Sequence, residues 1–318
     1  MRVLFVGTGD IGVPTLEWLL KSRHEVLGVV TQPDKPVGRH QELQASRIKQ
    51  IAIRENVPLF QPRKIREAGV IEEICAYAPQ VIVVIAYGQI LSRAFLDIPS
   101  LACLNLHASM LPRHRGAAPI QAVIEAGDAE TAMAVMYMAE GLDTGDVLMQ
   151  RKIRLKRRET GGSLHDRLAL IGPEVLSEAL DLLGQGTAPR TPQIEADATY
   201  AGKLTREHGE ISWRSSAEVD RKVRAMNPWP GAYTWLPMDG GRKKLKVFSV
   251  IQSRTPSGGM ASGTILASEK RGILVAAGER SVWLTEVQLE GKKRMRASEF
   301  IRGTSVKVGI VCGTSTLP

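Results

Sequence analysis

Two side chains that can do chemistry lie close together in the stretch CLNLHASMLPRHRGAAP, residues 103–119. The stretch begins with the apolar alternation of a β-strand and ends as a loop. Successive strand side chains point to opposite faces, so Asn105 and His107 share one face while Leu104 and Leu106 share the other. An amide can donate a hydrogen bond to an oxygen that becomes negative in a transition state. A histidine can do the same when protonated, or move a proton when neutral.

An acidic partner for this pair is available in EGLDTGD, residues 140–146, where Asp143 and Asp146 follow a strand-like run. A carboxylate beside the histidine would hold the ring and favour its charged form. The residues alone leave open which of the two acids does so. No Ser or Cys stands in a recognisable nucleophile motif. We therefore expect a carbonyl-type group to pass directly to an incoming nucleophile, although an Asn-x-His pair at a strand end also fits a purely structural role.

The elements that must position these residues alternate along the first two hundred positions. Continuous apolar strands are predicted in RVLFVG, EVLGVVTQ, PQVIVVIAYG and CLNLHAS, with helical patterns between them in VPTLEWLLKS, ASRIKQIAIREN and VIEEICAYA. Such strands are typical of a parallel sheet that is covered on both faces. Ligands of these sheets bind outside the carboxyl ends of the strands, where Asn105 and His107 should lie. QPDKPVGRHQEL, residues 32–43, is predicted to be a loop.

The character of the sequence changes near Gly184. We predict a catalytic domain over 1–189, a linker over 190–206 that is rich in Pro and small residues, and a C-terminal domain over 207–318. In the last part a helix is predicted at AEVDRKVRAM, residues 217–226. The short β-type runs around it, ending with VKVGIV, favour a small β-barrel. The basic run Arg151–Arg158 is interpreted as a solvated edge strand.

Composition restricts the function classes. The chain has 318 residues and is 43% hydrophobic, which is enough for a large core and two domains. Three cysteines (Cys75, Cys103 and Cys312) lie far apart without a CxxC pair. This predicts a reducing compartment and argues against a zinc site or a disulfide framework. No signal-peptide core and no apolar run of membrane-spanning length is seen, so a cytoplasmic protein is expected.

The positive charge is concentrated at the C-terminal end. Of a formal net charge of +9, residues 207–318 contribute +8, with 18 Lys and Arg against 10 Asp and Glu. Basic runs lie at Lys243–Lys246 and Gly291–Arg296. Such an excess favours a polyanionic partner, nucleic acid or an acidic surface, over a charge that serves only solubility.

A glycine motif offers an alternative function. Gly7–Gly12 reads GTGDIG, matching GxGxxG between a predicted strand and helix, and Asp34 follows at about the dinucleotide-motif spacing of ~20 residues. These residues suggest an NAD(P)-dependent oxidoreductase. Asp34 lies beyond the strand, however, and a tight strand-to-helix turn requires glycines in any case.

Several motifs together resemble a known family. NLHASMLPRHRGAAP, residues 105–119, resembles the signature of the folate-dependent formyltransferases, and GLDTGD, residues 141–146, resembles their second motif. GAAPIQ, TQPDKPVGR and MNPWPGAYTWL resemble the methionyl-tRNA formyltransferase branch in particular. The resemblance covers nearly the whole chain. It implies an α/β fold: a Rossmann-like, mostly parallel sheet domain followed by a small OB-like β-barrel domain.

The resemblance also implies a reaction, the transfer of a formyl group from 10-formyltetrahydrofolate to the amino group of methionine on initiator tRNA. By that likeness Asn105 and His107 stabilise the tetrahedral oxyanion, and Asp143 keeps His107 protonated and helps proton transfer. No metal is implied. A monomer is expected.

Folate-binding segments are implied at the ends of two strands and before Asp143. A buried pterin edge needs donors and acceptors, which strand-end backbone can supply. The residues implied are Tyr87, Gly88, Gln89, Ile90, Leu91, Ser109, Met110, Leu111, Pro112 and Gly141.

Transfer-RNA contacts are implied in two places. In the loop after the second strand, Lys35 and Arg39 would reach the acceptor stem, although the family's usual lysine pair after Arg39 is replaced by His40-Gln41-Glu42. His114 also departs from the family, which usually carries an aromatic residue there. In the basic C-terminal domain phosphate contacts would give salt-dependent affinity, and the residues implied are Lys243, Lys244, Lys246, Lys292, Lys293 and Arg294.

Four other functions are alternatives to this one. Folate-dependent formyltransferases that act on glycinamide ribonucleotide are typically single domains, and those that act on sugar nucleotides usually carry a dehydrogenase domain. A basic RNA-binding protein with a degenerate enzyme core would bind tRNA without turnover. The dinucleotide enzyme would bind NAD(P)H.

Overall fold

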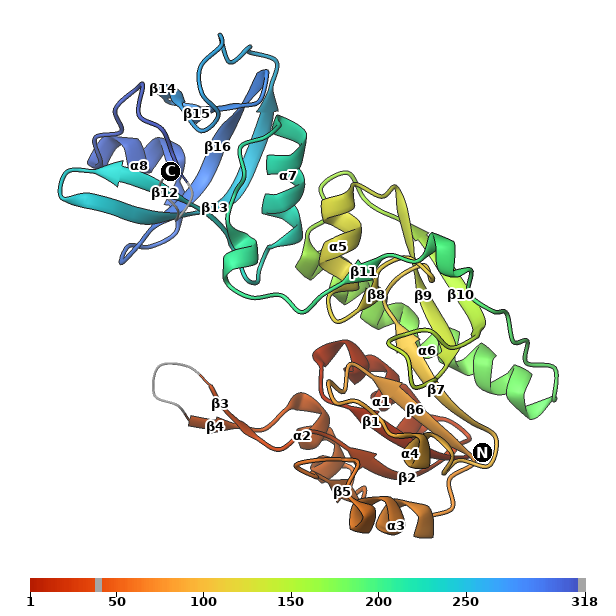
Figure 1. The fold of residues 1–318 in the computed structure, drawn as a ribbon. Helices are drawn as coiled ribbons and strands as arrows, with labels where there is room; N and C mark the ends of the chain where they lie inside the picture. Colours follow the sequence, from red (N-terminus) through yellow and green to blue (C-terminus); the bar gives the residue numbers. More distant parts are fainter. Residues whose placement is uncertain (38–41, 314–318) are drawn as a thin grey trace. The chain divides into compact units, whose positions relative to one another are not determined.

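The computed structural model describes residues 1–37 and 42–313 (Figure 1). The chain divides into two compact units. The first unit comprises Met1–Pro119, Ala129–Leu155 and His165–Gly202. The second unit comprises Ile120–Asp128, Lys156–Leu164 and Lys203–Pro318. Among the described residues no helix is both long enough and apolar enough to cross a bilayer.

The first unit is built on a seven-stranded sheet in the order β10-β9-β7-β6-β1-β2-β5. Five strands run parallel, as the sequence predicts: β1 (Arg2–Gly7), β2 (Glu25–Val30), β5 (Leu59–Phe60), β6 (Val81–Ile85) and β7 (Ala102–His107). The other two, β9 (Glu130–Tyr137) and β10 (Val147–Arg154), are antiparallel. The mostly parallel α/β sheet is therefore confirmed.

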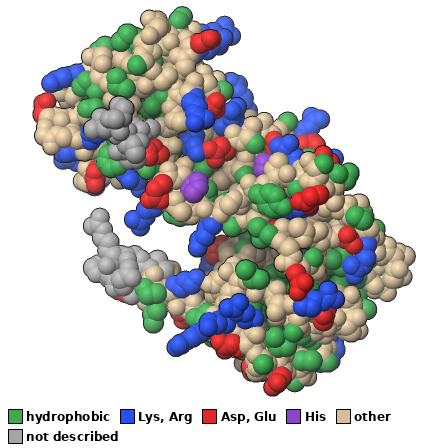
Figure 2. Space-filling view, viewed as in Figure 1, with side chains coloured by type: hydrophobic (Ala, Val, Ile, Leu, Met, Phe, Trp, Pro, Cys, Tyr) green, Lys and Arg blue, Asp and Glu red, His purple; other side chains and the backbone are tan. Residues whose placement is uncertain are grey.

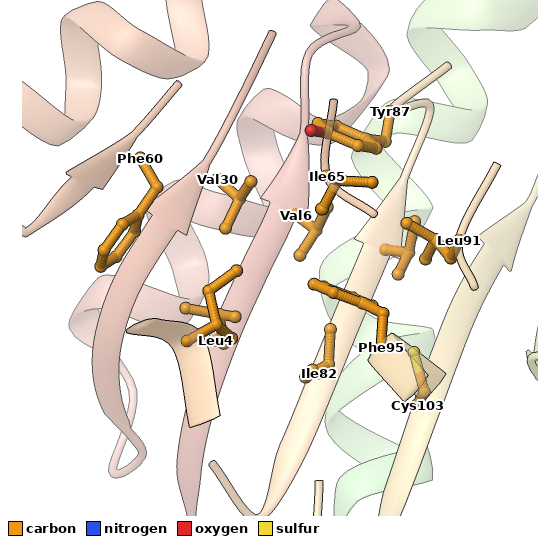
Figure 3. Close-up of a cluster of buried hydrophobic side chains, with 12 residues drawn as sticks. Leu4, Val6, Val30, Phe60, Ile65, Ile82, Tyr87, Leu91, Phe95 and Cys103 are labelled. Atoms are coloured by element: carbon orange, nitrogen blue, oxygen red, sulfur yellow. The ribbon is translucent and has the colours of Figure 1, made fainter. Parts of the chain in front are cut away.

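The helices that cover both faces of the sheet explain the apolar character of these strands. All the residues of β6 and β7 are buried, because the sheet is covered on both faces. Figure 3 shows one face, where Leu4, Ile82 and Cys103 pack under Phe95 of α4 (Arg93–Leu96). The covering helices are α1 (Val13–Lys21), α2 (Arg47–Arg54), α3 (Ala68–Ala76), α4 and α6 (Gly161–Gly184).

The face assignment within β7 follows from two contacts. Cys103 belongs to the cluster beneath Phe95. Leu106 packs on the opposite side, against α6, where a Cβ placed on Gly172 would lie 3.7 Å from Leu106 Cδ2. Asn105 and His107 alternate with Leu106 and therefore share the face of Cys103.

The segment predicted as a loop after β2 is instead a short hairpin. Strands β3 (Lys35–Val37) and β4 (Glu42–Gln44) pair antiparallel, with Lys35 opposite Gln44. Strands of three residues are too short to show periodicity. Pro36 also argues against a strand here, because proline is rare inside strands. Residues 38–41, which include Arg39, lie outside the described residues.

Part of the segment predicted as a linker, 190–206, belongs to the first unit. Within it β11 (Tyr200–Ala201) pairs with β8 (Arg115–Gly116) in a separate two-stranded sheet. The backbone N–H of Arg115 also donates to Thr199 O at 2.8 Å. The segment that follows β7 is thus paired with residues about eighty positions later in the chain.

The edge-strand interpretation of the basic run is confirmed for its first residues. β10 forms one edge of the seven-stranded sheet. Its Arg151 bonds to Glu174 and Glu178 of α6, at 2.8 and 2.5 Å. The basic side chain therefore pairs with acids of its own unit.

The second unit holds a six-stranded antiparallel sheet in the order β12-β13-β16-β15-β14, with β17 paired to β16. The strands are β12 (Ala232–Met238), β13 (Gly241–Ser253), β14 (Ile265–Glu269), β15 (Gly272–Ala277), β16 (Arg280–Leu289) and β17 (Met295–Arg296). The helices are α5 (Pro119–Ala126), α7 (Ser216–Ala225) and α8 (Ala297–Gly303). The predicted α7 is confirmed and α8 was not predicted.

One strand prediction in this unit is wrong. VKVGIV, residues 306–311, forms no strand, and only isolated bridges join Val311 to Thr264 and Gly313 to Trp235. Gly309 has a φ of +88°, which interrupts extended pairing in the run.

Candidate active site

The structure brings together the three side chains with the chemistry predicted from the sequence. Asn105 and His107 lie at the carboxyl end of β7, and Asp143 lies in the loop between β9 and β10. Asn105 Nδ2 donates to Asp143 Oδ1 at 3.4 Å, and His107 Nδ1 lies 3.5 Å from Asp143 Oδ2. Asn105 and His107 are only 8% and 5% exposed. Of the two acids left open by the sequence, Asp143 is the one that faces the histidine.

The histidine ring is held from both sides. Its Nε2 lies 3.1 Å from the carbonyl oxygen of His114. Because a carbonyl can only accept, Nε2 must carry a proton, which assigns the ring's orientation from its hydrogen-bond network. The other nitrogen faces the Asp143 carboxylate, a second acceptor.

The Asp143 carboxylate is held by backbone as well as by side chains. The N–H of Gly116 donates to Asp143 Oδ2 at 2.7 Å. Asp143 itself has a φ of +52°, a left-handed conformation that is uncommon for a residue other than glycine. Such a conformation persists only where its surroundings impose it. The loop's own residues 139–142 are exposed and offer little of that constraint.

The backbone of this loop is bonded to Gln193, a residue that is not predicted from the sequence. Its Nε2 donates to the carbonyl oxygens of Asp143 and Gly145, at 2.8 and 2.7 Å. Its Oε1 accepts from Arg115 Nε at 3.1 Å. Gln193 lies in the segment predicted as a linker, where no local pattern marks it. Two long-range pairings bring it beside the Asp143 loop: the bridge between Thr191 and Val147, and the pairing of β11 with β8.

Arg115 is a buried charge in the same network. It is 1% exposed, and its Nη1 donates to Glu195 Oε2 at 2.7 Å and to the Tyr200 hydroxyl at 3.1 Å. The hydrogen bond from Arg115 holds the pKa of Glu195 below its ordinary value. Desolvation opposes the charge on Arg115, yet Glu195 and Tyr200 raise the pKa of the guanidinium above its ordinary value.

The folate segments implied by the resemblance follow β6 and β7, two neighbouring parallel strands. After β6, Tyr87 and Leu91 are buried, and burial raises the pKa of Tyr87 to about 12. The Tyr87 hydroxyl has no hydrogen-bond partner among the described residues. Gln89 braces the loop, because its Oε1 accepts from Ile65 N at 3.0 Å. Gly88 has a φ of +80°, which allows the turn between them.

After β7, the second implied folate segment is held by its own turn. Buried Ser109 donates from Oγ to Arg113 O at 2.6 Å. Met110 and Pro112 are half-buried, and Leu111 is buried in a small cluster.

Exposed apolar side chains accompany these segments. Ile90 is 85% exposed, although it follows a fully buried strand. Leu142, between Gly141 and Asp143, is also exposed. Gly141 leaves no room for a side chain, since a Cβ there would collide with Thr144 Oγ1. Apolar surface beside polar strand ends is the composition expected of a site for a flat aromatic ring.

The glycines of the dinucleotide-like motif have a packing explanation. A Cβ on Gly7 would lie 2.8 Å from the carbonyl oxygen of Ile85, and one on Gly9 would lie 2.9 Å from the Cβ of Ala86. Asp34 bonds to Lys49 Nζ at 2.7 Å and to Gln61 Nε2 at 3.0 Å. The glycines thus allow β1 to approach β6, and the acid is already paired.

The basic residues of the C-terminal prediction meet at one end of the second unit's sheet. Lys246 of β13 pairs with Gln288 of β16, and Gln288 Nε2 donates to Lys292 O at 2.9 Å. Lys243, Lys246, Lys292 and Lys293 are exposed. Lys244 Nζ lies 4.0 Å from the Tyr233 ring centre.

Two of the predicted tRNA contacts are engaged within the protein. Arg294 donates to both oxygens of Glu286, at 2.8 and 2.7 Å, which occupies much of its guanidinium. Lys35 Nζ donates to Gln32 Oε1 at 2.5 Å. Figure 2 shows Lys and Arg side chains at several places on the visible face of each unit, with acidic side chains between them. The described residues include no group of three or more His, Cys, Asp or Glu that could hold a metal ion.

Comparison with known proteins identifies the family. The family model "Formyl transferase" matches residues 1–180, and "Formyl transferase, C-terminal domain" matches residues 203–305. A methionyl-tRNA formyltransferase of Methylacidiphilum infernorum is 46% identical over 316 residues, 98% of each chain. One of Clostridioides difficile is 42% identical over 314 residues, 98% of this chain and 100% of its own.

Solved structures agree at the level of the fold. WlaRD, a sugar 3N-formyl transferase, superposes with a TM-score of 0.65 at 14% identity, over 92% of this chain and 99% of its own. HypX from Aquifex aeolicus, in complex with tetrahydrofolic acid, gives a TM-score of 0.61 at 19% identity, over 95% of this chain and 47% of its own. By its sequence in both units, and by its fold, this chain belongs to the formyltransferase family.

Proposed function

We propose that this protein transfers a formyl group from 10-formyltetrahydrofolate to the α-amino group of methionine on initiator tRNA, for translation initiation. The observation that carries this proposal is full-length similarity at 41–46% identity to relatives named methionyl-tRNA formyltransferase. Sugar N-formyltransferases share the fold at only 14% identity. The oxidoreductase alternative is not favoured, because its glycines and Asp34 have structural explanations.

The chemistry falls to Asn105 and His107 at the end of β7 and to Asp143 of the β9–β10 loop. In the reaction the amino nitrogen attacks the formyl carbon, the carbonyl oxygen becomes negative, and N10 of the folate leaves with a proton. Asn105 and an imidazolium at His107 would donate hydrogen bonds to that oxygen. Asp143, which faces both donors at 3.4–3.5 Å, would orient them and accept the proton of the attacking amine through water.

The residues present fit a folate. The exposed side chains of Ile90 and Leu142 supply apolar surface in segments that follow β6 or precede Asp143, and the Tyr87 hydroxyl is a buried polar atom with no partner among the described residues. We assign the folate to Tyr87–Leu91, Ser109–Pro112 and Gly141. When bound, 10-formyltetrahydrofolate supplies the activated formyl group. No metal is assigned a part in this scheme.

We assign tRNA contacts to the second unit and to the hairpin. The exposed lysines at 243, 246, 292 and 293 can contact phosphates, and Lys244, Arg294, Lys35 and Arg39 complete the proposed set. An OB-like barrel is supported by residues 310–313. This segment bonds to the β14 side through Ile265 N–Ile310 O at 2.8 Å and to β12 through Gly313 N–Trp235 O at 3.0 Å, so it joins the two edges of the sheet.

The same proposal covers organisation and location. Residues 1–189 would form the catalytic domain and 207–318 the tRNA-binding domain, joined by 190–206. A monomer acting in the cytoplasm, where initiator tRNA is charged, is expected.

A formylation assay tests the function. Purified protein is mixed with charged initiator tRNA and 10-formyltetrahydrofolate, and formyl-methionine is measured for wild type and His107→Ala. Wild type should turn over, and the variant should lose about 10²–10³-fold in kcat, the cost of removing an oxyanion donor. Retention of full activity by His107→Ala would exclude His107 from the mechanism. Binding of tRNA without turnover by wild type would favour the RNA-binding alternative.

A further inference from the structure

We propose that Gln193 is a positioning residue that holds the Asp143 loop in its working conformation, with Arg115 as its anchor. This inference rests on the proposed function, since it concerns the loop that carries the proposed acid. The hydrogen bonds that the Gln193 amide donates go to backbone and not to the side chains of Asn105, His107 or Asp143. Gln193 acts on the backbone of Asp143 and Gly145.

The orientation of the Gln193 amide is unambiguous. Two carbonyl oxygens, which can only accept, lie 2.8 and 2.7 Å from one end, and a guanidinium, which can only donate, lies 3.1 Å from the other. Both N–H groups and one lone pair of the oxygen are therefore used. A glutamine whose polar atoms are all bonded is fixed in one rotamer, unlike a glutamine exposed to water.

The loop requires such hydrogen bonds because its backbone is strained and tightly packed. Asp143 has a φ of +52°, and a Cβ on Gly145 would collide with the carbonyl oxygen of Tyr137. A left-handed conformation is strained for a residue with a side chain and persists only when its neighbours impose it. Gln193 bonds to residues on both sides of Thr144, and so holds the turn at its two ends.

Arg115 holds the other end of the amide. Its guanidinium is buried and also bonded to Glu195 and Tyr200, so it cannot follow the glutamine if the loop moves. The next residue, Gly116, donates its N–H to the Asp143 carboxylate at 2.7 Å. Of these two adjacent residues of β8, Gly116 therefore bonds to the Asp143 side chain directly, and Arg115 acts on the Asp143 backbone through Gln193.

The first experiment compares Gln193→Ala with Gln185→Ala, an exposed glutamine of the same unit that has no contact with the loop. A displacement of about 1 Å can cost on the order of 10²-fold in rate. We expect kcat of Gln193→Ala to fall about 10- to 100-fold, with KM for tRNA within about twofold, and Gln185→Ala to match wild type. Gln193→Glu, which presents an oxygen to two carbonyls, should lose as much.

The second experiment asks whether the loss acts through Asp143. In an Asp143→Asn background, Gln193→Ala should cost less than about twofold more. Amide hydrogen exchange of residues 140–146 should accelerate in Gln193→Ala and stay unchanged in Gln185→Ala. Multiplicative losses in the double variant, or unchanged exchange, would overturn the inference. Failure of wild type to formylate tRNA would instead remove the proposed function, and the exchange measurement would still decide whether Gln193 holds the loop.

Discussion

The two regions assigned to function are built in opposite ways. At the end of β7 the polar side chains are almost fully buried and bonded to one another, to Asp143 and to backbone. At the basic end of the second unit's sheet, Lys246, Lys292 and Lys293 project into solvent. Hydrogen bonds weaken steeply when angle or distance changes, whereas charge attraction decays slowly and is screened by salt. The first region therefore depends on position, and the second depends on the number of charges.

This contrast predicts an all-or-none response in the first region. Asp143→Asn keeps the size of the side chain but turns an N–H₂ or a neutral oxygen toward His107. Formylation should fall about 10³-fold, within the range for loss of an acid–base group. Asp146→Asn makes the same change in the same loop without a contact to His107, and should lose less than about tenfold. Equal losses in the two variants would remove the special place of Asp143.

The second region should respond in graded steps. In Lys246→Ala/Lys292→Ala, tRNA affinity should fall for every tRNA, and the slope of log affinity against log salt should decrease by about 1 for each phosphate that is no longer neutralised. Arg254 and Arg280 are exposed at the opposite end of the same strands, since Ser253 pairs with Ser281. Arg254→Ala/Arg280→Ala is therefore the control of equal charge. A larger change in this control would place the tRNA surface at the other end of the sheet.

The smallest expected effect is on the free energy of unfolding, through the Arg115–Glu195 ion pair next to the first region. The hydrogen bond from Arg115 lowers the pKa of Glu195 below its ordinary value of 4.5. A lowered pKa in the folded state means that the charged carboxylate stabilises the fold above about pH 4.5, and that this contribution disappears as pH falls through the lowered pKa. Urea unfolding of wild type and Glu195→Gln from pH 7 to pH 3 measures it. The two stability curves should converge at low pH, and a constant gap would contradict the assignment.

Local pattern predicted much of the fold. The strands β1, β6 and β7 are continuous apolar runs, and α7 has a clear helical period, so each was predicted from its own residues. The hairpin of β3 and β4, with three residues a strand, was missed because it is shorter than any period. Helix α8 was missed because its seven residues, ASEFIRG, show barely two turns of pattern. The direction of β9 and β10 depends on pairing partners, which local periodicity does not specify.

The residues of the candidate site also separate into those that local pattern predicts and those that long-range pairing brings together. Asn105 and His107 were predicted to share a face because a strand alternates strictly, and the structure places both beside Asp143. Arg115, Gln193 and Glu195 form their network because segments some eighty residues apart pair in the fold, β11 with β8, and because Thr191 bridges to Val147. Nothing near Gln193 in the sequence distinguishes it from the polar residues of a linker.

The sequence by itself determined the strands, the helical periods, the Asn-x-His face and the concentration of charge after residue 206, because each depends on neighbours in the chain. The tertiary structure alone decided which acid meets the histidine, how a left-handed Asp143 is maintained, and where two basic segments come together. Those outcomes depend on hydrogen bonds between residues that are distant in sequence, and such bonds exist only once the sheets have formed.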